Sequence, residues 1–393
     1  NHHHLDFKHM KIIFTTVCFI LNAVVCRSQV NDSVQITGIR TKASITLDNV
    51  TNLSGGIQRG TALLALFSIS LDYSPKARIL KNTGFHLHLI KTAGKGASEN
   101  FIGDLQVASN IEGRYSLFFY EMLVRQRIGH FTATVGMHDL NSEFMVSDYA
   151  GDFINSSFGI LPSVSLNVPV SIFPSTTFGG LISYSKEKLD VLAGIYNLNY
   201  EFCEEETFHF NNHFYQRGYL GVGEVHYRYF RHDRQVAECR IGAYLKKCYD
   251  YNDENMPGES VGDINTGLYF IGDVALVEFS EGNMLGAFVQ AGWSPLEKNL
   301  ASQYLGAGIS YRCESGKFTP EQLGLALGRV KLNEFQGDRF EDMNQSETVI
   351  EATATVPLFK LLKIQPDIQY IISPSGIYDN SITAIVRIKA DLM

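Results

Sequence analysis

The sequence of 393 residues has few tryptophans, prolines and cysteines. It contains one Trp, 10 Pro and 6 Cys, against 34 Gly, 26 Phe and 19 Tyr. No two cysteines are spaced as in C-x-x-C, so their spacing indicates neither a zinc site nor a redox motif, and a disulfide between Cys203 and Cys248 stays an open alternative. Because the formal net charge is −8, the chain lacks the basic surface of nucleic-acid-binding proteins, and we expect no nucleic-acid partner.

Long hydrophobic runs are missing after residue 29, although 45% of the residues are hydrophobic. No later window approaches the ~18 consecutive apolar residues that a membrane helix needs. The run IIFTTVCFILNAVVC follows Met10 and Lys11 and precedes small or polar residues, which predicts a secretory signal peptide over 10–28. A buried N-terminal helix or a membrane anchor is the alternative.

The remaining boundaries are set by composition. Residues 1–9 have the composition of a tag or of a mis-assigned start, so we expect a non-native extension there. Residues 29–42 form a short N-terminal segment. No linker, Pro-rich seam or charge block divides the rest of the chain, so we expect a single domain over 43–393.

Alternation with a period of two residues dominates this domain. In FHLHLIKT, Phe85, Leu87 and Leu89 share one face of an extended strand, and His86 and His88 share the other. The same pattern recurs in HFTATVGMHD, YLGVGEVHYRYFR, AECRIGAYLKK and SITAIVRIKADLM. Each expected strand therefore has one apolar face and one polar or charged face.

The length and number of these strands point to a membrane barrel. Several are ten or more residues long and begin or end in Tyr or Phe, whereas a soluble sandwich uses shorter strands and turns its apolar faces inward. We expect strand starts near residues 43, 61, 84, 115, 129, 177, 188, 218, 235, 266, 284, 303, 322, 346, 364 and 380. Short links near 127–129, 186–188 and 281–282 alternate with long ones at 92–112, 139–175, 199–217, 249–264 and 333–345. The sequence thus predicts an all-β fold: a transmembrane antiparallel β-barrel of about 16 strands, with long extracellular loops and one or more infolded loops.

One stretch does not fit the strand pattern. Residues 139–159, DLNSEFMVSDYAGDFINSSFG, hold four carboxylates, two asparagines and four aromatic residues without an apolar period of 3.6 or 2. Long polar segments inside a compact domain usually line a site or are disordered, and the aromatic residues argue against disorder. We therefore expect a functional loop here.

Several separated motifs resemble the OprB family of carbohydrate-selective porins. They are SITLDNVTNLSGGIQRG, GDLQVASNIEG, FFYEMLVRQ, VGMHDLNSEFMVSDYAGDFINSSFGI, and IQPDIQYIISPSG followed by YDN, in that order from about residue 43 to the C-terminus. The chain departs from the family pattern by ending in Met393 rather than an aromatic residue, and by carrying Arg125 where an acidic residue is expected. The second departure leaves sugar specificity open.

The resemblance implies an outer-membrane porin that lets small sugars such as glucose diffuse passively. It implies no catalytic residues, no enzyme activity and no cofactor. It also implies export through the periplasm, insertion by the barrel-assembly machinery, and contact with outer-membrane lipid and lipopolysaccharide, and it leaves a homo-oligomer open. A general diffusion porin for other solutes is the main alternative, followed by a structural or adhesive barrel with a plugged lumen.

A selective channel for sugars needs carboxylates, amides and guanidinium groups close together, with an aromatic platform. Glu121 and Arg125 point into the lumen if Phe118, Tyr120, Met122 and Val124 face lipid. The candidates for the constriction are Glu121, Arg125, Arg114, Glu112, Asn110, Asp104, Asp139, Asn141, Glu143, Asp148, Asn155 and Arg59, with Tyr149, Phe153 and Phe158 as the platform. For each, a purely structural role in a turn or a wall network is the alternative.

Other functions lack their signatures. Strand parity places Arg228, Arg240, Lys246, Arg387 and Lys389 in the lumen, but Glu121, Glu224, Glu238, Asp273, Glu351 and Asp367 balance them, which disfavours an anion pore. The sequence contains no GxSxG motif, so it lacks that signature of a hydrolase. The histidines, including the i, i+4 pair His209 and His213, are not part of an HExxH motif, so we predict no metal site. The run Glu204, Glu205 and Glu206 is typical of a solvated extracellular loop.

Overall fold

The computed structural model describes residues 38–77, 80–198, 208–209, 218–231, 234–248, 264–280, 282–295, 299–314, 318–333 and 345–392. Several predictions fall outside these residues. They concern the extension 1–9, the signal peptide 10–28, Cys203 as a disulfide partner, the run Glu204 to Glu206, and His213.

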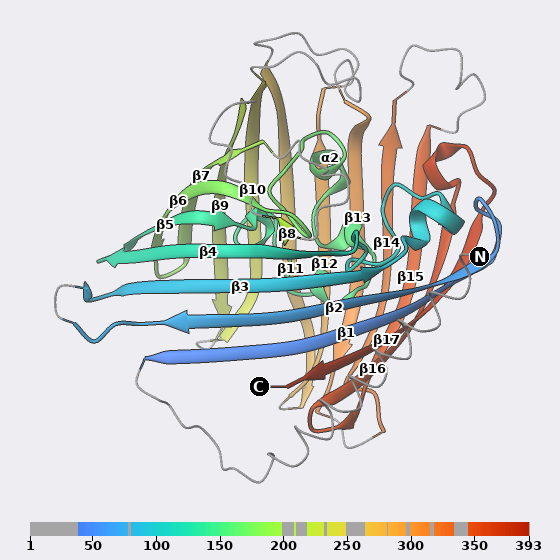
Figure 1. The fold of residues 1–393 in the computed structure, drawn as a ribbon, viewed down its shortest axis with the longest axis horizontal. Coiled ribbons are helices and arrows are strands. Elements are labelled where there is room, and N and C mark those ends of the chain that lie inside the picture. Colours follow the sequence, from blue (N-terminus) through green and yellow to red (C-terminus); the bar gives the residue numbers. More distant parts are fainter. Residues whose placement is uncertain are drawn as a thin grey trace.

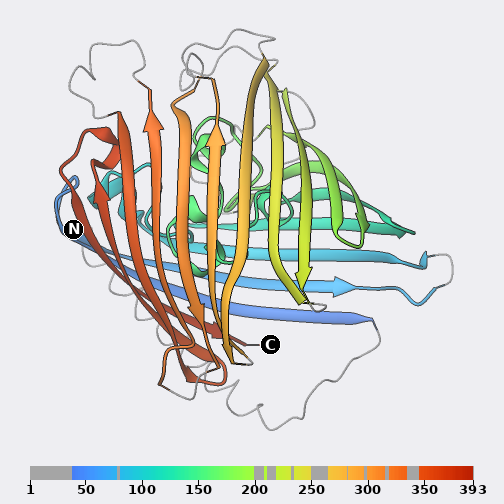
Figure 2. The same ribbon diagram turned by 180° about the vertical axis from the view of Figure 1, so that it is seen from behind.

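Sixteen long antiparallel strands in the described residues form a sheet that closes on itself (Figures 1 and 2). They are β1 (Ile39–Ser54), β2 (Gly60–Tyr73), β3 (Thr83–Gly94), β4 (Ser116–Ile128), β5 (Phe131–His138), β6 (Thr177–Lys186), β7 (Leu189–Asn197), β9 (Gly218–Arg231), β10 (Arg234–Cys248), β11 (Ile264–Ser280), β12 (Asn283–Trp293), β13 (Ala301–Arg312), β14 (Gln322–Leu332), β15 (Ser346–Phe359), β16 (Leu362–Ile372) and β17 (Ser381–Asp391). Each strand pairs with the next, and β1 pairs with β17 to close the ring. The predicted barrel of about 16 strands is confirmed.

Two details add to this arrangement. β8 (Phe208–His209) lies between β7 and β9 in the sequence and pairs in parallel with β4 at Leu117 and Phe118. β1 begins at Ile39, so the barrel starts four residues before the expected boundary at residue 43.

The period of two places apolar side chains outside the barrel and polar ones inside. On β9, Tyr229 is 52% exposed while Glu224 is 2% exposed. The inner faces of other strands likewise bury polar side chains, including Glu347, Glu351 and Thr383, while their outer faces expose Leu, Ile, Val and Tyr. A soluble barrel would show the reverse arrangement, so the outer face is built to contact lipid.

The expected outward direction of Phe118 and Tyr120 on β4 is wrong. Both side chains are buried, whereas Met122 and Val124 are exposed on the outside as predicted. The register explains the difference, because His88 pairs with Glu121 and the next residue, Leu89, pairs with Phe119. Tyr120 is therefore the extra residue of a β-bulge, and the bulge shifts the parity of everything before it by one residue.

The links between strands alternate in length. Residues 129–130, 187–188 and 360–361 make tight turns at one end, while residues 95–115 and 139–176 make long links at the other. Short helices occupy some of the long links: η2 (Ser98–Ile102), η3 (Leu140–Ser142), η4 (Ala150–Asp152), η5 (Ser156–Phe158), α2 (Pro162–Ser165) and η7 (Pro374–Gly376). Within the described ranges, no helix is long and apolar enough to span a membrane.

Two of the long links fold into the barrel, as the sequence predicts (Figures 1 and 2). We call residues 139–176 the inserted loop and residues 95–115 the second inserted segment. The largest apolar clusters lie between these links and the inner wall; one joins Phe144 and Leu161 of the inserted loop to Tyr269 of β11 and Tyr304 of β13. The hydrophobic core of this protein therefore lies between the inserted links and the inner wall of the barrel.

Candidate solute constriction

Carboxylates on the barrel wall hold the backbone of the inserted loop. The amide N–H of Met145 donates to Glu224 at 2.8 Å, and that of Tyr149 donates to Asp273 at 3.1 Å. The amides of Ile154 and Asn155 both donate to Glu351, at 2.6 and 3.0 Å. Buried backbone amides of a loop that are not paired within a helix or a sheet must each find another acceptor, and here the wall carboxylates supply it. β9, β11 and β15 therefore position the loop across the lumen from β5, where it begins.

Glycines on the inner wall let the inserted loop approach the strands directly. A Cβ atom at Gly286 of β12 would lie 2.0 Å from the ring of Tyr149, and one at Gly292 would lie 1.9 Å from the Ser163 hydroxyl oxygen. Neither position has room for a side chain. The close approach also brings Phe153 and Phe158 against Phe288, with ring centroids 5.7 and 5.8 Å apart.

The second inserted segment packs on the first and is held in the same way. The amides of Leu105 and Gln106 donate to Glu347 of β15 at 2.8 and 2.9 Å. Backbone hydrogen bonds join the two links directly: Asn110 N–H donates to Ile154 O at 2.9 Å, and Ser156 N–H donates to Val107 O at 3.0 Å. The two links therefore form one body inside the barrel.

An ion pair joins the inserted loop to β4. Arg125 Nη2 lies 2.9 Å from Glu143 Oε1, and the Arg125 Nε–H also donates to the Thr134 hydroxyl at 3.3 Å. The Arg125 side chain is 50% exposed and that of Glu143 is 32% exposed. Donors and acceptors of both groups thus stay open to solvent within the barrel.

Two further arginines join the wall to the inserted links. Arg312 of β13 lies 2.9 Å from Asp148 and 2.8 Å from Asp152, and its guanidinium stacks 4.8 Å from the ring centroid of Tyr149. Arg387 of β17 makes two hydrogen bonds with Asp48 of β1, at 2.8 and 2.7 Å, and donates to Asn110 at 2.7 Å. Arg387 thereby ties the barrel closure to the second inserted segment.

The inward-facing arginines of β9 and β10 are paired as well. Arg228 lies 2.9 Å from Asp190, and Arg240 lies 3.0 Å from Glu238. His226 contacts Glu224. Charges of both signs alternate along the described lumen wall, which argues against an unpaired basic ladder of the kind that an anion pore requires.

The predicted site residues divide by exposure. Arg59, Asn110, Arg114, Arg125 and Asp148 are exposed; Glu112, Asp139, Asn141 and Glu143 are half-buried; Asp104, Glu121 and Asn155 are buried. Asn155 accepts from Ser157 N–H and donates to Gln369, so it shapes the loop. Asn141 donates to the carbonyl oxygens of Phe144 and Gly159, at 3.1 and 3.3 Å.

The aromatic platform does not lie where the sequence predicts. Phe153 and Phe158 are almost fully buried in the cluster with Phe288, and Tyr149 lies beneath Arg312. Aromatic residues in the loop serve its packing on the glycine-containing wall, a role that composition alone does not separate from solute contact.

Burial raises the pKa values of three acidic side chains in the inserted links. Burial raises the pKa of Glu112 to about 7, with the nearby Asp104 adding to the effect, although Glu112 accepts hydrogen bonds from the amides of Ala97 and Ser98. Burial likewise raises the pKa of Asp104 to about 6 and that of Asp139 to about 7. Asp139 is the N-cap of η3, accepting from Asn141 N–H at 2.9 Å.

Sequence reasoning missed Arg312, Asp48 and Glu347 as parts of this site. Arg312 shares the inner face of β13 with Ser310, and Ser310 and Arg312 both donate to Asp152. Strand parity was the available signal for all three residues. Strand parity does not reveal which wall carboxylates accept hydrogen bonds from the amides of a distant loop.

The family model described as carbohydrate-selective porin, OprB family, matches residues 65–392. No curated protein sequence matches the chain. The high-pH structure of Pseudomonas putida OprB is similar, with a TM-score of 0.74 and 16% identity, over 90% of this chain and 94% of that one. The low-pH structure of the same protein has a TM-score of 0.57 and 13% identity, over 90% and 92%. A triple mutant of the Rhodopseudomonas blastica porin has a TM-score of 0.52 and 10% identity, over 90% and 99%. These structural likenesses show the fold.

Proposed function

The chain belongs to the OprB family of carbohydrate-selective porins, and on this premise we propose that small sugars such as glucose are selected at the charged surface between the inserted links and the inner wall. The protein is a channel of the outer membrane rather than an enzyme. Solutes cross it by diffusion, so selection must come from weak contacts that form and break as the solute passes.

The observation that carries this proposal is the ion pair of Arg125 and Glu143. One side chain comes from the wall and the other from the inserted loop, and both are partly exposed. A guanidinium group offers five donors and a carboxylate only accepts, so together they match hydroxyl groups that both donate and accept. Asp148 and Asn110, exposed beside Arg312 and Arg387, extend the same chemistry along the path.

The other candidates take different parts in the proposal. Arg59 and Arg114 add exposed guanidinium groups near the long links, and Glu112, Asp139 and Asn141 hold the backbone that carries the contacts. Asp104, Glu121 and Asn155 are buried rather than exposed to the solute, and Glu121 and Asn155 position the inserted loop by accepting from the Asp139 and Ser157 amides. Export by a signal peptide, insertion by the barrel-assembly machinery and contact with lipopolysaccharide complete the proposal, and oligomeric state stays open.

Sugar-induced block of single-channel current tests the proposed contacts. We expect glucose and a disaccharide to reduce the current through the parent channel, and Glu143→Gln to weaken this block because it removes the ion pair. Glu314→Gln is the matched control, since Glu314 is exposed just after β13 and lies outside both inserted links. Equal currents with and without sugar would leave a general diffusion porin, and the absence of channels in the bilayer would contradict a pore altogether.

A further inference from the structure

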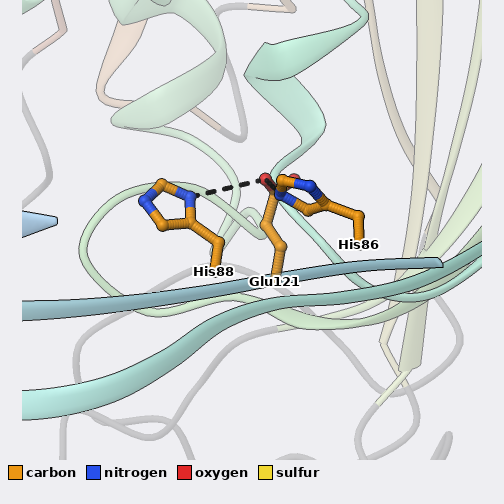
Figure 3. Close-up of side chains that lie close together, drawn as sticks. All are labelled: His86, His88 and Glu121. Atoms are coloured by element: carbon orange, nitrogen blue, oxygen red, sulfur yellow. Dashed lines mark ion pairs between the residues drawn. The ribbon is translucent and has the colours of Figure 1, made fainter. Parts of the chain in front are cut away.

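Two histidines and a carboxylate converge on the inner wall at the root of the inserted loop (Figure 3). His86 and His88 share the inner face of β3, and the β-bulge at Tyr120 brings Glu121 of β4 opposite His88. His86 Nε2 lies 3.4 Å from Glu121 Oε2, and His88 Nδ1 lies 3.7 Å from the same oxygen. The three side chains rise from the same side of the sheet.

In each of the three side chains, the other polar atom already has a partner of its own. His86 Nδ1 lies 2.8 Å from Asp72 Oδ1, and His88 Nε2 lies 2.7 Å from the Ser68 hydroxyl. Glu121 Oε1 accepts from the Asp139 amide at 3.2 Å. This leaves His86 Nε2, His88 Nδ1 and Glu121 Oε2 facing one another, all within 4.8 Å.

The spacing fits metal coordination better than hydrogen bonding. The two N···O separations, 3.4 and 3.7 Å, exceed the usual 2.7–3.2 Å of an N–H···O bond. Tetrahedral zinc with bonds of about 2.0–2.2 Å sets its ligand atoms about 3.3 Å apart. Hydrogen bonding of the distal ring nitrogen to a carboxylate is also the usual support of a ligating histidine, and Asp72 supplies it to His86.

We propose that His86, His88 and Glu121 bind a divalent transition-metal ion of the zinc type on the lumen wall, with Asp72 and Ser68 orienting the two imidazoles. The side chains of His86, His88 and Glu121 are 25%, 20% and 10% exposed, so water can complete the coordination from the lumen. His138 is not a ligand, because its ring nitrogens contact the hydroxyls of Tyr196 and Ser142, at 2.8 and 3.1 Å. Two nitrogens and one oxygen favour zinc over magnesium or calcium, which prefer oxygen.

The site goes beyond sugar diffusion and does not depend on it. Glu121 binds the metal through one oxygen and holds the Asp139 amide through the other. A bound ion therefore fixes the point where the inserted loop leaves β5. The ion thus links β3, β4 and the inserted loop.

Zinc binding to the full chain in detergent micelles tests the proposal, measured by competition with a chromophoric chelator. Every sample carries alanine at His2, His3, His4 and His9, since these histidines can bind metal themselves. We expect His86→Ala and His88→Ala each to remove one zinc equivalent per chain. Asp72→Asn, which leaves all three ligands in place, should weaken that equivalent roughly 10- to 100-fold. His130→Ala is the control, because His130 lies in the β4–β5 turn and contacts Ser185 O.

Hydrogen exchange supplies a second measurement on the same samples. Zinc should slow amide exchange at residues 139–145 in the parent chain and in His130→Ala, but not in His88→Ala. Unchanged zinc stoichiometry in both His86→Ala and His88→Ala would overturn the proposal, as would the lack of any zinc binding by the parent. Magnesium at the same concentration should neither bind nor slow exchange.

Discussion

Single residues in the lumen work as pairs. Arg125 is ion-paired with Glu143, Arg312 with Asp148 and Asp152, and Arg387 with Asp48. In each of these pairs the wall contributes the arginine. Strand parity predicts the lumen position of Arg125 and Arg387, because the side-chain period of a strand is two. It does not predict their partners, which are set by the path of the links and by the register of the barrel closure.

Replacement of Arg125 by alanine should reduce the preference for sugars. The variant loses donors to the solute and leaves Glu143 without its partner. A hydrogen bond contributes about 1 kcal/mol, so we expect roughly a fivefold fall in the ratio of sugar to zwitterion entry. Arg127→Ala is the matched control, because Arg127 is exposed near the β4–β5 turn and donates to Gly129 O. Equal losses in both variants would place the preference elsewhere.

The pKa of Glu112 predicts that the second inserted segment loosens as the pH rises. Burial raises this pKa to about 7 in the folded protein, above the ordinary value of 4.5. Between those values the folded state binds more protons than the unfolded state, so the free energy that holds the segment falls with rising pH and levels off above about 7. Amide exchange at residues 95–115, corrected for intrinsic rates, should therefore be slower at about pH 5 than at about pH 8.

Glu112→Gln tests the cause of this pH dependence. Glutamine keeps an oxygen for the Ala97 and Ser98 amides but carries no charge to desolvate. We expect slow exchange at both pH values, apart from a smaller change due to Asp104, whose pKa is raised to about 6. The same pH dependence in the variant and the parent would exclude Glu112 as its source.

Among the elements, the strands are the best predicted and the inserted links the least. Expected strand starts lie within four residues of the observed ones, because alternation and strand length repeat sixteen times. The β-bulge at Tyr120 has no local signature, and it alone reverses the predicted direction of Phe118 and Tyr120. The proposed metal ligands likewise form no sequence motif, since they come from two neighbouring strands rather than from one helix.

The inserted loop depends on glycine at the wall, which Gly286→Ala tests. The added methyl group would meet the Tyr149 ring at 2.0 Å, and overpacking of this kind costs about 1–3 kcal/mol. We expect faster amide exchange at residues 145–155 and a larger single-channel conductance, because the loop moves off the wall. Gly221→Ala provides the control, as its Cβ would meet nothing closer than 3.9 Å. If Gly286→Ala behaves like Gly221→Ala, direct packing of Tyr149 does not hold the loop.

At the scale of the whole molecule, the barrel reverses the sidedness of a soluble protein. Its exposed surface is rich in Leu, Ile, Val and Tyr, and its interior buries Glu, Asp, Gln and Thr together with the inserted links. Composition and periodicity predict this architecture, since each strand shows it independently. They do not predict which carboxylates meet loop amides, because those contacts join residues about 80 to 240 positions apart.

Paired charges in the lumen predict weak ion selectivity. The inward-facing arginines Arg125, Arg228, Arg240, Arg312 and Arg387 each lie beside a carboxylate. The wall carboxylates that instead accept from loop amides, such as Glu347 and Glu351, are buried, so neither sign of charge prevails on the exposed part of the described wall. Reversal potentials in a salt gradient should lie near zero. Asp148→Asn should move them toward anion selectivity, since Asp148 is the most exposed of the paired acids named here. A strongly anion-selective parent channel would contradict the balance of charge.

Liposome swelling measures directly whether the lumen selects sugars. The full chain is reconstituted and the entry of glucose, a disaccharide and zwitterionic solutes of similar size is compared, with Glu121→Ala, Arg125→Ala and Arg127→Ala alongside. We expect faster entry of sugars than of size-matched zwitterions, a preference lost in Arg125→Ala and retained in Arg127→Ala. Glu121→Ala should act indirectly, by releasing the Asp139 amide and the root of the inserted loop. Equal entry of all solutes into parent liposomes would contradict sugar selection, and the absence of swelling would contradict a channel.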